Sequence, residues 1–149
     1  MTTNVFRSLH ESPRGYNYRF VITPSDLTET TDNTAQDITL VTLPAYSVVK
    51  SAATYLKTPF KQASDASYNS NTVIVGDAAD DNRYIASQQI NENGSEVLAQ
   101  AQASTTPFAN TAATAVVAKF ASMASYSLAD LDTGEIHIFL EVAQLDSLT

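Results

Sequence analysis

The 149-residue chain contains no cysteine and no tryptophan, and it has only four glycines and two histidines. The absence of cysteine excludes a disulfide framework, a thiolate nucleophile and a cysteine-ligated metal site. No uninterrupted apolar stretch approaches the roughly 18 residues that a membrane-spanning helix requires. Residues 1–10 hold no apolar signal core either, so we expect neither membrane insertion nor secretion.

Charged residues are also scarce, at 16 % of the chain, and most of them are acidic, which gives a net charge of −8. Residues 1–19 carry a net +2, from three arginines and one glutamate, whereas residues 20–149 carry −10. Because phosphate contacts need lysine and arginine, the acidic body argues against a nucleic-acid partner. The N-terminal arginines suit docking on an acidic protein surface, with a frayed terminus as the alternative.

The apolar fraction of 44 % and the length of the chain are sufficient for one domain with a buried core. Short runs of β-branched and aromatic residues alternate with turns rich in proline, glycine and asparagine, without a convincing amphipathic helix. This pattern predicts an all-β fold, an antiparallel jelly-roll-like β-sandwich. We place an extended N-terminal arm at residues 1–17 and a single β-sandwich domain at residues 18–149.

About eight strands are predicted, and the clearest spans residues 135–145. There Ile136, Ile138 and Leu140 alternate with the residues of the opposite face, which is the period of a strand. The other strands are expected at residues 16–23, 37–43, 46–60, 72–75, 83–86, 96–101 and 115–123.

Three segments carry additional local signals for strands and turns. Residues 46–60 contain enough alanine for a helix, but their β-branched residues and the flanking prolines favour one long strand. The pair Asn93-Gly94 predicts a hairpin, because both residues tolerate positive φ. Residues 132–134, Asp-Thr-Gly, predict a turn.

Residues 72–90 raise the question of a chemical site, because Gly76 is followed by Asp77, Asp80 and Asp81. A phosphate-binding loop needs several glycines and a lysine, which this stretch lacks. An EF-hand loop starting at Asp77 fails at its third and sixth positions, which hold alanine and asparagine. A calcium site of another kind, built from these carboxylates, stays open as an alternative.

The favoured interpretation of this stretch is a structural turn made by Gly76, Asp77, Asp80 and Arg83. In such a turn the glycine supplies a special φ, and the aspartates accept hydrogen bonds from their own backbone. We expect Arg83 to pair with Asp77, Asp80 or Asp81 and to stabilise the corner.

Neither the Gly-x-Ser-x-Gly nor the His-Glu-x-x-His pattern of hydrolases occurs. Glu135, His137 and Glu141 share one face of the final strand and could hold a metal, although a solvated or interface face is the simpler interpretation. Phe139 on that face suggests a covering loop or another subunit. We therefore predict no catalytic residue, no metal site and no cofactor, and we expect that the protein is not an enzyme.

Carbohydrate binding would require exposed aromatic side chains as platforms. Tyr16, Tyr18, Tyr55 and Tyr68 are available for that role. Packing at the edge of the core or in an interface is the favoured role for these tyrosines.

Four short motifs occur in order along the chain. They are Leu43-Pro44-Ala45, Thr58-Pro59-Phe60, Val75-Gly76-Asp77 with Asp80, Arg83 and Tyr84, and Thr133-Gly134-Glu135 with Ile136, Ile138 and Leu145. Together they resemble the head decoration (cement) proteins of tailed bacteriophages, over about residues 37–145. The motifs mark positions in a fold and contain no catalytic signature.

The resemblance implies a jelly-roll-like sandwich that binds the outside of an icosahedral capsid. Such a protein bridges neighbouring major capsid proteins and stabilises the head against the pressure of the packaged genome. The implied location is the outer surface of the virion, after synthesis in the host cytoplasm. Another virion β-sandwich, such as a tail, fibre or receptor- or glycan-binding module, is the alternative.

The implied partners are the major capsid protein and neighbouring copies of the chain, as a homotrimer in preference to a dimer, with no nucleic acid and no membrane. Arginine and aromatic residues are enriched at interface hot spots, and the N-terminal segment contains several of both. The candidate capsid contacts are Phe6, Arg7, His10, Arg14, Tyr16, Tyr18 and Arg19.

Overall fold

The computed structural model describes residues 1–5, 15–91 and 108–145, which form nine strands and two short 3-10 turns. The strands are β1 (Thr2–Val5), β2 (Tyr18–Ile22), β3 (Gln36–Leu43), β4 (Ser47–Lys61), β5 (Thr72–Asp77), β6 (Asp80–Gln89), β7 (Phe108–Ala109), β8 (Thr114–Ala121) and β9 (Thr133–Gln144). The 3-10 turns are η2 (Pro24–Asp26) and η3 (Leu128–Asp130).

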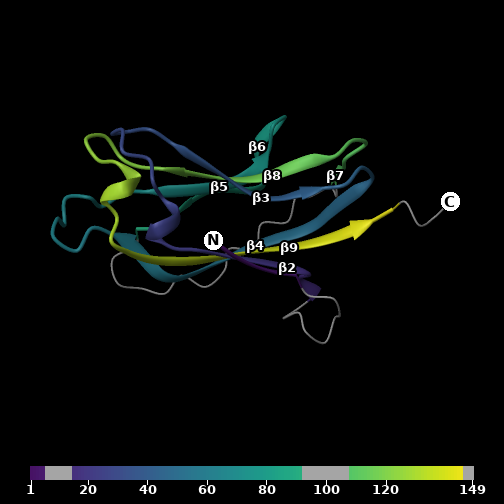
Figure 1. The fold of residues 1–149 in the computed structure, drawn as a ribbon, viewed down its shortest axis with the longest axis horizontal. Helices are drawn as coiled ribbons and strands as arrows, with labels where there is room; N and C mark the ends of the chain where they lie inside the picture. The colour runs from purple at the N-terminus through teal and green to yellow at the C-terminus, as the bar shows by residue number, and fades with distance from the viewer. Residues whose placement is uncertain (6–14, 92–107, 146–149) are drawn as a thin grey trace.

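The strands form two layers, and within each layer all neighbouring strands are antiparallel. One sheet has five strands in the order β1-β2-β9-β4-β7, and the other has four in the order β3-β8-β5-β6. Figure 1 shows the two sheets stacked face to face. From β2 onward the chain crosses repeatedly between the sheets in the order of a jelly roll, with β1 added at one edge. The predicted fold class is confirmed.

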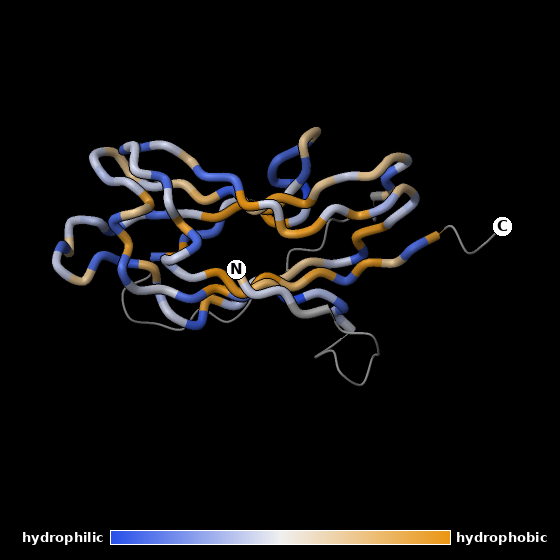
Figure 2. Tube along the Cα trace, viewed as in Figure 1, coloured by the Kyte–Doolittle hydropathy of each residue, from blue (hydrophilic) through white to orange (hydrophobic). Residues whose placement is uncertain are grey.

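The core lies between the layers and follows from the alternation along the strands. Ile136, Ile138 and Leu140 of β9 are fully buried, as their period of two predicts. The rings of Phe20 and Phe120 enter the same core from opposite sheets. Figure 2 shows hydrophobic positions along the strands of both layers, with hydrophilic positions gathered in the loops.

The pairing of β4 with β9 is the longest among the described strands, and it aligns the side chains on the outer face of the five-stranded sheet. It runs from Ser47 opposite Gln144 to Lys61 opposite Thr133, with three register shifts. The strand prediction for residues 46–60 is therefore confirmed over a strand of 15 residues. Because directly opposed residues point to the same side, this register decides which side chains of β4 and β9 meet.

The N-terminal residues differ from the expected arm. Thr2 is paired with Val21 and Val5 with Tyr18, so β1 is an edge strand of the five-stranded sheet. Thr2 and Thr3 are exposed, which explains why no buried period marks this strand. Residues 6–14, the predicted hairpin at Asn93-Gly94 and the predicted strand at residues 96–101 lie outside the described residues. The domain boundary after residue 17 stays a prediction.

The turn predicted at residues 132–134 was wrong, because β9 already begins at Thr133. Gly134 has φ of +146°, which L side chains rarely adopt, and a Cβ there would lie 2.4 Å from the ring of Phe60. The glycine is therefore required inside the strand, where it makes room for a core aromatic ring.

Candidate functional site

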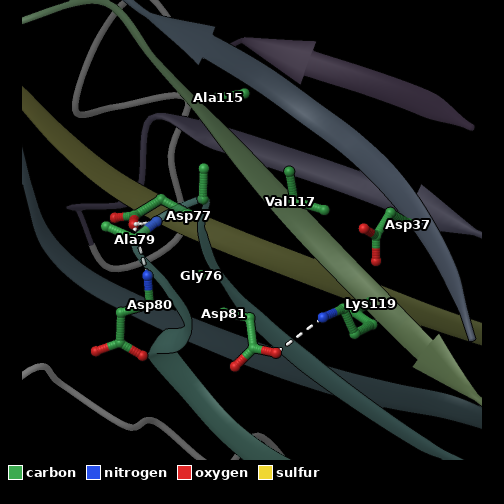
Figure 3. A pocket seen from close by; sticks show the side chains of 10 residues that line it. Asp37, Gly76, Asp77, Ala79, Asp80, Asp81, Ala115, Val117 and Lys119 are labelled. Carbon is green, nitrogen blue, oxygen red and sulfur yellow. Dashed lines mark hydrogen bonds and ion pairs between the residues drawn. The ribbon is translucent and has the colours of Figure 1, made fainter.

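The acidic stretch singled out by its sequence forms the corner between β5 and β6. Asp77 and Asp80 are opposed across this hairpin, with Ala78 and Ala79 at its tip. Oδ1 of Asp77 accepts hydrogen bonds from the backbone amides of Ala79, at 2.9 Å, and Asp80, at 3.1 Å. Figure 3 shows this corner and the acidic residues around it.

The other carboxylate oxygen of Asp77 binds two side chains of β6. Its Oδ2 accepts from Nε of Arg83 at 2.7 Å and from the hydroxyl of Tyr84 at 3.1 Å. Burial by itself would raise the pKa of Asp77, but these bonds and those from the backbone amides outweigh burial and lower the pKa. Both oxygens of Asp77 therefore act within the hairpin itself.

Gly76 is needed for space and not for its φ, which corrects the expectation from the sequence. Positive φ among glycines is found at Gly15 and Gly134, and Gly76 does not share it. A Cβ at Gly76 would lie 2.2 Å from the carbonyl oxygen of Asp80. The backbone of β6 crosses closely at this point because the β5–β6 register shifts on both sides of Val75.

Next to the corner, a surface hollow of about 600 Å³ is lined by Asp37, Asp80, Asp81 and Lys119. Asp81 binds Lys119 at 2.8 Å across it, as Figure 3 shows. This hydrogen bond raises the pKa of Lys119. Within the described residues, no three His, Cys, Asp or Glu side chains are placed to hold a metal ion. The cation that lines this hollow is thus already paired with a carboxylate.

The outer face of the five-stranded sheet carries a different feature, a row of four rings. Tyr16 contacts Phe139 at 5.7 Å between ring centroids, Phe139 contacts His137 at 6.2 Å, and His137 contacts Tyr55 at 5.7 Å. We call Tyr16, Phe139, His137 and Tyr55 the aromatic row. All four side chains are partly exposed. Tyr16, from the segment that precedes β2, contacts Phe139 and leaves it partly exposed, so the expected cover by a loop or another subunit stays a prediction.

Asn17 holds Tyr16 in this position by extending β2 alongside β9. Its backbone amide donates to the carbonyl of Leu140 at 3.1 Å, and its side chain exchanges two bonds with the backbone of Val142, at 2.7 and 2.8 Å. The row is therefore built on a fixed strand edge and not on a loose terminus.

Ion pairs stand at both ends of the aromatic row. Lys57 binds Glu135 at 3.0 Å and Lys50 binds Glu141 at 2.5 Å. Hydrogen bonds from His137 and Lys57 lower the pKa of Glu135. The carboxylates considered as metal ligands with His137 are thus each paired with a lysine. Exposed pairs of this kind contribute little stability, about 0–1 kcal/mol each, and mainly form a polar rim.

Three of the candidate contact residues of the N-terminal segment are described by the structure, and they lie on two different faces of the sheet. Tyr16 joins the aromatic row, and Arg19 is opposed to Phe139 on the neighbouring strand, with its Nε lacking a hydrogen-bond partner. Tyr18 instead packs against the core and stacks on Phe20. The other candidates, Phe6, Arg7, His10 and Arg14, lie outside the described residues.

The tyrosines proposed as glycan platforms are all engaged by neighbours. Tyr68 is buried and stacks on Tyr126 at 4.6 Å, while Tyr55 meets His137 edge-on. The most exposed aromatic of the described residues is instead Tyr46, at 56 %. Its exposure could not be predicted from the sequence, because nothing in the local pattern around Tyr46 marks it.

The fold defines the protein as a jelly-roll β-sandwich. No helix among the described residues is long and apolar enough to span a membrane. No family model and no curated protein sequence matches the chain.

The structure is similar to one chain of the solved structure described as the cyanophage Pam1 capsid asymmetric unit. The TM-score is 0.55 at 19 % sequence identity, and the match covers 88 % of this chain and 86 % of that chain. At this identity the likeness establishes a shared fold, and it does so over nearly the whole length of both chains.

Proposed function

We propose that the protein is a structural component of a phage capsid, and more specifically a decoration (cement) protein on the outer surface of the head. One observation carries this proposal, the end-to-end jelly-roll match to a chain from a phage capsid asymmetric unit. The resemblance of its ordered motifs to those of decoration proteins supports the finer proposal. The protein then acts by binding and bridging, and catalysis is not part of its role.

The capsid-binding surface in this proposal is the outer face of the five-stranded sheet. The aromatic row, with Arg19 beside Phe139, combines the residue types that dominate interface hot spots, and the lysine–glutamate pairs form its rim. Phe6, Arg7, His10 and Arg14 precede Tyr16 and extend the same proposed contact.

The charges of the strands favour this face over the opposite one. The strands of the five-stranded sheet carry Arg19, Lys50, Lys57 and Lys61 against two glutamates. The strands of the four-stranded sheet carry four aspartates against one arginine and one lysine. On a chain of net charge −8, the five-stranded sheet is the surface that best approaches an acidic shell. Repeated attachment over a symmetric lattice turns modest single contacts into stable decoration.

The test is deletion of the gene from the phage that encodes the chain, followed by cryo-electron microscopy of purified heads. We expect heads that lack a set of protrusions on the outer shell, and restoration of these protrusions when the purified protein is added. Heads with unchanged outer density would contradict the proposal. Loss of density from the tail or its fibres would assign the protein to another part of the virion.

A further inference from the structure

One end of the sandwich presents an exposed tyrosine on a turn that holds it in an unfavourable backbone conformation. Tyr46 lies between β3 and β4, is 56 % exposed and has φ of +62°. The amide of Ser47 donates to the carbonyl of Pro44, which closes a four-residue turn. Tyr46 occupies the third position of this turn, where a positive φ favours glycine or asparagine.

Hydrogen bonds with the residues that directly follow β7 and β9 hold the backbone of Tyr46 in place. Its amide donates to the carbonyl of Asn110 at 2.6 Å, and its carbonyl accepts from the amide of Leu145 at 3.1 Å. The side chain of Gln144 donates to the carbonyl of Ala45 at 2.7 Å. Leu145, itself 40 % exposed, lies beside Tyr46 at the end of the chain described here. The tyrosine is thus presented rigidly, as an interface anchor is.

Asn110 also lines a surface hollow of about 450 Å³. Six alanines line it, two from the β5–β6 hairpin and four from residues 109–115. The one ionisable residue among those that line it is Asp77, which is 3 % exposed and paired with Arg83. Figure 1 shows the β3–β4 connection, β7 and the start of β8 at the same end of the molecule. A protruding aromatic side chain and an uncharged hollow therefore stand side by side.

We propose that Tyr46 of one copy of the protein inserts into the alanine-lined hollow of a second copy. The walls of methyl groups accept an uncharged ring and would leave a charged side chain without a partner. Two copies, each with a net charge of −8, repel over most of their surface, whereas the lining of the hollow holds a single carboxylate, which is buried and paired with Arg83.

Each contact joins Tyr46 of one copy to the hollow of another. Because both features lie at the same end of the molecule, the contact can be made reciprocally about a two-fold axis or repeated around a ring. The inference deepens the proposed function, on which its biological meaning rests, because it supplies the contact between neighbouring decoration subunits. It leaves the aromatic row free for the capsid.

The test measures self-association of the full chain by sedimentation velocity over a range of concentrations, with no capsid present. Tyr46→Gly removes the ring and suits the positive φ, so it should keep the melting temperature of the wild type while losing self-association. Ala113→Gln fills the hollow from an exposed position and should have the same effect. Asn33→Gly, at another exposed residue with positive φ, is the matched control and should associate like the wild type.

Mixing the two defective variants tests whether Tyr46 and the hollow are the two halves of one contact. Ala113→Gln retains a sound tyrosine and Tyr46→Gly retains a sound hollow, so the mixture should form a one-to-one dimer that neither variant forms alone. A monomeric wild type, self-association of Tyr46→Gly or a mixture without dimers would each overturn the proposal. Because no capsid is present, these outcomes are separate from failure of the proposed capsid role.

Discussion

Nε of Arg83 donates to Oδ2 of Asp77 at 2.7 Å, across the corner between β5 and β6. The carboxylate is 3 % exposed and the arginine 18 %, so the pair is largely withdrawn from water. Tyr84 and two backbone amides of the hairpin bind the same carboxylate. The cluster of acids that suggested a chemical site is thus organised around one structural ion pair.

Replacing Arg83 with alanine should therefore destabilise the fold. The variant leaves a buried carboxylate without its cation, and a hydrogen bond to a charged group contributes about 1.5–3 kcal/mol. We expect a loss of that order in the free energy of unfolding, measured by urea denaturation. Lys119→Ala, which removes the exposed partner of Asp81, is the matched control and should cost less than about 1 kcal/mol. Equal effects of both substitutions would contradict the structural role of Arg83.

The same cluster should make stability depend on acid pH. The pKa of Asp77 is lower in the folded protein than its ordinary value of 3.8, so the unfolded chain takes up the proton first. The stabilisation is complete above about pH 4 and is lost as the pH falls through the folded pKa. Asp77→Asn should flatten this part of the pH profile of unfolding. An unchanged profile for a folded Asp77→Asn variant would contradict this role of the carboxylate.

Gly76→Ala should be more harmful than its size suggests. The new methyl group would lie 2.2 Å from the carbonyl oxygen of Asp80, where only backbone movement can relieve the overlap. Overpacking of this kind costs about 1–3 kcal/mol or more. Gly15→Ala, whose Cβ would meet nothing within 4 Å, isolates the separate effect of positive φ. A thermal melt in which Gly76→Ala matched the wild type would show that β6 can move away.

Two buried tyrosines should limit stability in alkali. Burial raises the pKa of Tyr68 and of Tyr84 to about 12 each, with nearby aspartates adding to the effect. Because the unfolded tyrosines ionise near pH 10, their contribution is complete below that pH and is lost as the pH rises toward 12. Absorbance at the phenolate band should show two groups that titrate late and together with unfolding. Early titration of all tyrosines in the folded protein would contradict this burial.

The aromatic row gives the capsid proposal a mutational test. Phe139→Ser should weaken binding to heads by at least tenfold, since a hot-spot aromatic contributes about 2 kcal/mol or more. Val117→Ser makes a similar change on the outer face of the four-stranded sheet and should bind like the wild type. Co-sedimentation with heads that lack the protein measures both. Undiminished binding of a folded Phe139→Ser variant would place the contact elsewhere.

Much of the architecture could be predicted from local patterns. The alternation through Ile136, Ile138 and Leu140 predicted β9, and β-branched residues between prolines predicted β4. These signals are reliable because a strand directs successive side chains to opposite faces wherever it lies. β1 was not predicted, because an exposed edge strand needs no buried face. The role of Gly134 was not predicted either, because it depends on close contact with the ring of Phe60 from β4.

The candidate sites were less predictable, because they depend on register and on the winding of the jelly roll. Asn17 meets Val142 from 125 residues away, and that contact sets Tyr16 on Phe139. Asn110 and Leu145, from distant parts of the chain, bind the backbone of the turn that carries the exposed Tyr46. By itself the sequence determined the strands, their inward faces and the fold class, since these follow from the pleat of the backbone. Only the tertiary structure decided which outer side chains adjoin, because that depends on how distant strands are aligned.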